Sequence, residues 1–202
     1  MPMFQLPSAT AINKPLYKKA LFEKFNLKAT ERDRFDTDIS RMSLVARVSP
    51  STVPALAEGE EIKGFYVLQV ILKQRDYDVK NILLLQKLIP QKIVFALQYE
   101  EQTQLCIFHT RLQQSEWQSY NDTVIPLQGL TLDAAWNNLV ATIGGLDATS
   151  EESIEEQIIN REQQEKLLRQ IEMLEKRCRA EKQTRKKYEL HQQIMKLKEV
   201  LE

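Results

Sequence analysis

The C-terminal quarter of the chain constrains the fold most, because nothing in it interrupts a helix. No glycine or proline occurs after residue 153, and these two residue types are the usual helix breakers. Large apolar residues recur there at alternating intervals of four and three positions, which is the spacing of an apolar helix seam. The sequence therefore predicts helix over residues 154–202, with one face that has to be covered.

The positions of this seam fall into two groups that are out of phase. They are Leu167, Ile171, Leu174 and Cys178, followed by Leu190, Ile194, Leu197 and Leu201. Between the groups, residues 179–187 contain no large apolar side chain. A continuous coiled coil tolerates neither this gap nor the phase break. The pattern favours an antiparallel helical hairpin with its elbow at the gap, and leaves one long helix that forms a coiled coil with a second chain as the alternative.

A helical arm of this kind takes most of its stability from packing its apolar face. We therefore predict that the arm binds a protein partner. The predicted partner-binding residues are Leu167, Ile171, Leu174, Leu190, Ile194, Leu197 and Leu201.

The elbow of the arm is cationic. Residues 176–187 hold seven Lys or Arg residues and a single Glu. Such a charge density suits the phosphates of a nucleic acid or an acidic protein surface, and a merely solvated elbow is the alternative. The candidate anion-binding residues are Arg179, Lys182, Arg185, Lys186 and Lys187.

The preceding residues mix helical and strand patterns. Asn13 and Pro15 are typical helix-start residues, so segment 11–27 is predicted to be one helix. Apolar, β-branched stretches predict strands, and a run between Thr131 and Gly145 predicts a capped helix. The other expected elements are a helix from residue 30, strands over 42–48 and 64–73, a helix over 79–89, and a strand hairpin over 92–112.

This order of elements indicates an α+β fold with a mostly antiparallel sheet and packed helices, followed by the C-terminal helical hairpin or coiled-coil arm. Small polar residues after Gly145 are typical of a linker. We expect a globular domain over residues 1–145, a linker over 146–153, and the arm over 154–202.

Charge is uneven along the chain, although 28 Lys and Arg residues balance 28 Asp and Glu residues. A net charge of zero gives no global attraction to nucleic acid or to a membrane. Residues 1–47, however, hold nine cations and five acids. We therefore consider an anion or nucleic-acid site at Asn13, Lys14, Lys18 and Arg41, against the alternative of an exposed cationic surface without a ligand.

Several classes of protein are not indicated by the sequence. The N-terminal stretch lacks the pattern of a secretion signal, and no apolar run has the length of a membrane span, so a cytoplasmic protein without membrane contact is expected. Cys106 and Cys178 form no ligand or disulfide pattern. No glycine-rich phosphate loop is present. We accordingly expect neither a metal nor a cofactor.

Candidate catalytic residues do not converge. The two histidines, His109 and His191, are predicted to be an edge residue and a surface residue. A restriction-type nuclease would need a carboxylate two residues before a strand lysine, but Ile71 takes that place before Lys73. The sequence therefore favours a non-catalytic protein and assigns no catalytic residue.

Several stretches, taken in chain order, are similar to a known family. They are "LPSATAINKPLYKKALF", "RFDTDISRMSLVARVSPSTV", "LQKLIPQKIVFALQYEEQTQLCIF", "LQGLTLDAAWNNLVATIGG" and "AEKQTRKKYELHQQIMKLKEVL". Together they resemble the bacterial domain-of-unknown-function family 4391 over nearly the whole chain. The resemblance implies a gene setting beside helicase and DNA-methyltransferase genes in restriction-like or anti-phage clusters. Asn13, Lys14 and Lys18 match the N-terminal pattern of that family, which supplies no agreed catalytic residues.

Residues and resemblance lead to one functional hypothesis. The chain would be a non-catalytic accessory subunit of a bacterial restriction-like or anti-phage defence complex. Its arm would dock on a helicase-type partner, or on the methyltransferase of the same system. A diverged nuclease-type subunit and a homodimer that is joined by the arm and binds DNA are the two alternatives.

Overall fold

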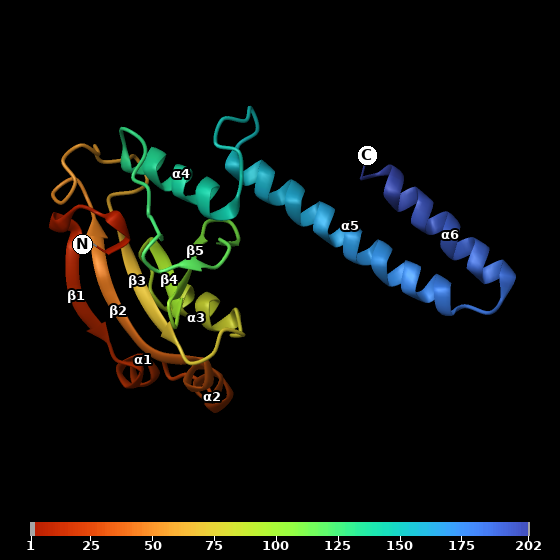
Figure 1. Cartoon of the computed structure of the whole chain (residues 1–202), viewed down its shortest axis with the longest axis horizontal. Helices are drawn as coiled ribbons and strands as arrows, with labels where there is room; N and C mark the ends of the chain where they lie inside the picture. Colours follow the sequence, from red (N-terminus) through yellow and green to blue (C-terminus); the bar gives the residue numbers. More distant parts are fainter. Residues whose placement is uncertain (1–2, 202) are drawn as a thin grey trace. The chain divides into compact units, whose positions relative to one another are not determined.

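A computed structural model describes residues 3–201 and divides the chain into two compact units. The first unit ends at Ser150 and the second begins at Glu151. The first unit holds all the strands and four α-helices, whereas the second consists of two helices (Figure 1). The predicted fold class is confirmed: the first unit is α+β with a mostly antiparallel sheet, and a helical pair follows it.

One sheet organises the first unit. Its strands lie in the order β1 to β6, with β7 paired to β5, and only β3 and β4 run parallel. The strand bounds are β1 Ala11–Leu16, β2 Ile39–Val48, β3 Phe65–Leu72, β4 Ile93–Tyr99, β5 Gln102–Phe108, β6 Leu112–Gln114 and β7 Gln118–Ser119. Two short 3-10 helices, Met3–Gln5 and Ser8–Thr10, precede β1. The parallel pair is possible because a helix, α3 (Lys80–Leu88), makes the crossover between β3 and β4.

Helices cover both faces of the sheet (Figure 1). Their bounds are α1 Lys18–Phe25, α2 Ala29–Asp38, α3 Lys80–Leu88 and α4 Leu132–Gly144. Side chains alternate along a strand, so Leu68, Val70 and Leu72 of β3 share one face and form a core with α1, α2 and α3. Phe65 points to the opposite face, where its ring packs edge-on against Trp136 of α4. We call these the three-helix face and the α4 face.

The start of the chain differs from the prediction. Segment 11–27 is a strand followed by a short helix, not a single helix, and Asn13 lies in β1 and caps nothing. Pairing with β2 overrides the local start signals. Pro15 is tolerated because β1 is the edge strand, where a missing N–H donor costs no ladder hydrogen bond.

Elements with strong local signals agree with the prediction. Strands β4 and β5 form the expected hairpin. The hydroxyl of Thr131 caps α4 by accepting from the Ala134 N–H at 3.2 Å, and Gly145 ends that helix at φ 61°. In α3, Leu85 is buried, whereas Leu83 and the N-cap residue Val79 are exposed.

The second unit is a pair of helices, which we call the arm. Helix α5 spans Ile154–Ala180 and α6 spans Thr184–Glu199, with residues 181–183 between them. They run antiparallel and pack on each other through Ile171, Leu174 and Ile194, which are buried (Figure 1). The Ser153 side chain and Glu156 form a capping box at the start of α5. The break in the seam therefore marks a turn in the chain, as the sequence pattern favoured.

None of the helices in the described part of the chain is long and apolar enough to cross a membrane.

Candidate functional site

A groove of about 720 Å³ opens on the three-helix face, beside the edge strand. Three segments line it: β1 with α1, the paired strands β2 and β3, and the connection from α3 to β4. Its floor is apolar, and includes Leu16, Leu21, Leu44, Ile89 and Ile93. Clefts of roughly 300–1,000 Å³ with apolar walls and a few placed polar groups are typical ligand sites.

A β-bulge brings the cations of this groove to one face. The register shifts in β2, so that Leu44 lies opposite Leu68 whereas Arg47 lies opposite Tyr66. Leu68 and Tyr66 are two residues apart and share a face, so Leu44 and Arg47 share it too, although they are three apart. Lys14 of β1 lies opposite Leu44 and joins them.

Three cations and no carboxylate line the groove: Lys14, Lys24 and Arg47. The Arg47 guanidinium lies 5.9 Å from the centre of the Tyr66 ring, and the Lys24 ammonium lies 5.3 Å from that of Phe25. Such cation–π contacts hold the side chains along the groove while leaving their charge exposed to a ligand. Tyr17, which is 70% exposed, adds an aromatic side chain at the rim. The arrangement can bind a negatively charged ligand that also carries apolar groups.

The predicted N-terminal site residues do not form one site. Lys14 lines the groove. Lys18 instead pairs with the Asp36 carboxylate and donates to the Ile39 carbonyl at 2.9 Å, which ties α1 to the end of α2. Asn13 and Arg41 line a second hollow, of about 420 Å³, on the α4 face. The strand prediction for 42–48 contained no information on the bulge, so the sequence alone could not sort these residues by face.

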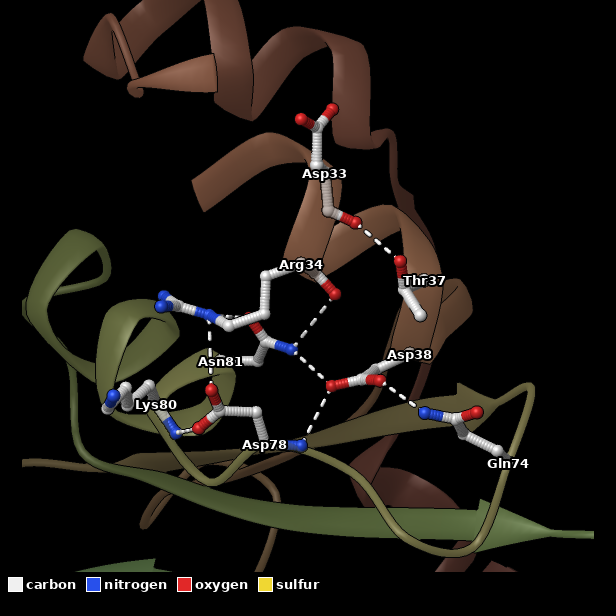
Figure 2. A network of polar contacts seen from close by, with 8 residues as sticks. All are labelled: Asp33, Arg34, Thr37, Asp38, Gln74, Asp78, Lys80 and Asn81. Carbon is white, nitrogen blue, oxygen red and sulfur yellow. Dashed lines mark hydrogen bonds and ion pairs between the residues drawn. The ribbon is translucent and has the colours of Figure 1, made fainter. Parts of the chain in front are cut away.

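A polar network around the buried Asp38 joins α2 to the start of α3 (Figure 2). The Asp38 carboxylate is buried and accepts hydrogen bonds from the Asn81 side chain at 2.7 Å, the Asp78 backbone N–H at 2.8 Å and the Gln74 side chain at 2.8 Å. Arg34 in turn donates to the Asn81 oxygen at 3.0 Å. These contacts join α2 to α3 and to the loop before α3.

The network of Asp38 is structural rather than a ligand site. Each of its bonds goes to a group of the same chain, and the carboxylate receives three donors, which suits a buried anion. Its effect on the groove is indirect, because α3 leads to Leu88 and Ile89 in the groove wall. No local pattern in the sequence predicts this network, because Asp38 and Asn81 lie far apart along the chain.

The buried thiol of Cys106, the neighbouring Tyr77 hydroxyl and the Lys73 ammonium are not arranged for catalysis. Burial raises the pKa of the Cys106 thiol to about 12, and burial likewise raises the pKa of the neighbouring Tyr77 hydroxyl, so neither is an activated nucleophile. Lys73 donates to the backbone carbonyl of Asp36. In residues 3–201, no group of three or more His, Cys, Asp or Glu side chains could hold a metal ion.

In the arm, the predicted partner-binding side chains face each other. Leu190, Leu197 and Leu201 pack half-buried around the buried centre of the pair, and Leu167 is also half-buried. The seam is thus closed within the chain, and a partner would meet the outer surfaces of the arm.

The predicted cations of the elbow are all exposed: Arg179, Lys182, Arg185, Lys186 and Lys187. Arg185 forms an ion pair with Glu189 at 3.3 Å, one helical turn further on. Contact of this elbow with nucleic acid or an acidic surface stays a prediction.

These features define a mixed α+β sheet domain with a cationic groove and a separate helical pair. The chain belongs to the family described as "Domain of unknown function (DUF4391)", whose model matches residues 4–201. The resemblance of the sequence stretches is thereby confirmed over nearly the whole chain. No curated protein and no solved structure matches it.

Proposed function

We propose that this protein is a cytoplasmic, non-catalytic accessory subunit that docks through its arm on a larger partner. The partner is a helicase-type ATPase of a bacterial restriction-like or anti-phage complex. The gene setting implied for the family supports the kind of partner, and the arm supports the docking role.

The observation that carries the proposal is the distribution of exposed apolar side chains. Of twelve large apolar residues exposed in the described chain, six lie in the arm, which is about a quarter of its length. They are Ile159, Leu168, Met173, Tyr188, Met195 and Val200. Concentrated exposed apolar side chains are typical of protein-interaction surfaces, and methionine adapts to varied partner shapes.

The core of the arm is also too small to account for the full length of its two helices. Its buried centre consists of Ile171 and Leu174 in the second half of α5 and of Ile194 in α6. Leu168 and Met173 flank this centre and are each 56% exposed. Helix α5 extends beyond the part that packs against α6, and this length supports an arm that reaches a second protein.

Co-expression with a helicase-type ATPase encoded beside the gene tests the proposal. The variant carries Leu168→Glu, Met173→Glu and Met195→Glu, which leave the buried centre unchanged. The matched control is Leu130→Glu, a substitution of an 82% exposed leucine in the first unit. We expect the wild type and the control to co-purify with the ATPase and the arm variant to lose it. Equal recovery of all three, or no complex with the wild type, would overturn the proposal.

A further inference from the structure

Two lysines next to the groove in sequence are paired with carboxylates, whereas the three cations that line the groove are not paired with any carboxylate of residues 3–201. Among the described residues, neither Lys14, Lys24 nor Arg47 forms an ion pair, whereas Lys18 pairs with Asp36 and Lys19 with Glu23. Neighbouring cations repel one another, and a bound anion would offset this repulsion. The groove thus carries a local charge of about +3 that the chain itself does not balance.

We propose that this groove binds an acidic peptide segment of a protein partner. Carboxylates of the peptide would pair with Lys14, Lys24 and Arg47, and a large apolar side chain between them would enter the groove. This inference goes beyond the proposed function, because it lies on the first unit and uses no property of the arm.

The apolar floor identifies the second half of the ligand. Leu16 and Leu44 are half-buried on adjacent strands, and Leu21 of α1 and Ile93 of β4 close the bottom. A small inorganic anion or a sugar phosphate would leave these side chains uncovered. Covering them with a leucine or an aromatic side chain removes apolar surface from water, which favours binding.

The aromatic residues favour a peptide over a single-stranded nucleic acid. Proteins that bind single strands offer successive open ring faces on which bases stack. Here the ring of Tyr66 is covered by Arg47 and that of Phe25 by Lys24, and only Tyr17 stands well exposed. The remaining floor is aliphatic and offers no stacking platform.

The groove is also built on rigid elements, as a specific site requires. Strands β1, β2 and β3 hold Lys14, Arg47 and Tyr66 in fixed register. The polar network of Asp38 fixes the start of α3, whose end forms the opposite wall. A preorganised site loses little conformational entropy when its ligand binds.

Selection from a random dodecapeptide library, displayed on phage, tests the inference on the full-length chain. We expect enriched peptides to combine several Asp or Glu residues with a leucine or an aromatic residue. Binding of the best synthetic peptide should weaken as salt rises, because charge pairs at a surface are screened. Enrichment of peptides without acids, or of none at all, would overturn the inference.

Two charge-reversed chains locate the binding. The test variant is Lys14→Glu with Arg47→Glu, and the matched control is Lys19→Glu with Lys80→Glu, which changes the net charge equally at exposed residues outside the groove. The test variant should lose about tenfold or more in peptide affinity, and the control less than about twofold. Should the double variant fail to fold, Lys24→Gln alone, at an exposed position, has to weaken binding as well.

An oligonucleotide separates the peptide from the competing ligand class. A fluorescent ten-nucleotide oligo-dT is titrated into the same chains. If it binds the wild type, loses affinity with Lys14→Glu and Arg47→Glu, and displaces the selected peptides, the groove is a nucleic-acid site and the inference fails. We expect no groove-dependent binding of the oligonucleotide. Loss of the helicase-type partner with arm variants is a separate result and leaves this one unchanged.

Discussion

The two units of this chain stabilise themselves in opposite ways. On the three-helix face of the sheet, thirteen residues are buried in one core, whereas the arm buries three between its helices. The first unit combines long-range strand pairing with this core, so it can fold without a partner. The arm has little beyond helix propensity, its caps and a narrow seam. The first unit is therefore the scaffold, and the arm is the part whose stability a bound partner would change most.

The largest effect is expected from the core of the first unit. Phe95→Ala, at a fully buried position, should destabilise this unit by about 3–5 kcal/mol. Both tryptophans, Trp117 and Trp136, lie in the first unit, so urea unfolding followed by their fluorescence reports it alone. A loss below about 1 kcal/mol would show that the packing is not as described.

A smaller loss is expected from the polar network. Asp38→Ala removes the acceptor of three hydrogen bonds and leaves the buried Asn81 nitrogen with only its longer bond to the Arg34 carbonyl, which should cost about 2–4 kcal/mol by the same fluorescence measurement. Asp33→Ala is the control, since Asp33 lies exposed on the same helix and its carboxylate takes no part in the network. Equal effects of the two substitutions would contradict the structural role of Asp38.

In the arm, the cost of a truncation should be lower and confined to α5 and α6. Leu174→Ala removes one of the three buried side chains and should destabilise the pair by about 2 kcal/mol. Leu168→Ala, at an exposed position, should change its stability by less than about 0.5 kcal/mol. Hydrogen exchange of the α5 and α6 amides measures both. Faster exchange spreading through the sheet would show that the units do not unfold separately.

The smallest expected effect is a pH dependence of the arm. The hydrogen bond from Lys198, at 2.8 Å, lowers the pKa of Glu175 below its ordinary value. A carboxyl with a lowered pKa in the folded state stabilises the fold above its unfolded pKa and loses this contribution as the pH falls through the folded pKa. The protection of the arm amides, measured relative to intrinsic exchange at each pH, should therefore fall on acidification, and Lys198→Ala should reduce this fall. An identical pH profile in the variant would show that this ion pair does not stabilise the arm.

The same contrast explains which features the sequence could predict. Helix α4 was predictable because Thr131 and Gly145 act locally. The arm was predictable because its apolar seam lies within about fifty consecutive residues. Strand β1 was not, since its conformation depends on pairing with β2, some thirty residues later. Residues close in sequence, such as Lys14 and Lys18, were expected to act together, yet one lines the groove and the other is tied to Asp36.

The candidate groove depends on a β-bulge that no pattern in the sequence predicts. A one-residue bulge in β2 turns Arg47 to the same face as Leu44, and without it the two side chains would point to opposite sides of the sheet. Charge counts had marked the first 47 residues as basic, which was a correct but unspecific signal. Only the strand register selects which of those cations share a surface.

The solution mass of the full-length chain, alone and mixed with the helicase-type ATPase, tests the central claim most directly. Because the arm closes its seam within one chain, we predict the mass of a single chain alone and a complex in the mixture. The complex should disappear with Leu168→Glu, Met173→Glu and Met195→Glu. A chain that is a dimer by itself, and that Leu174→Asp splits, would contradict the account, since the arm would then join two copies rather than dock on a partner.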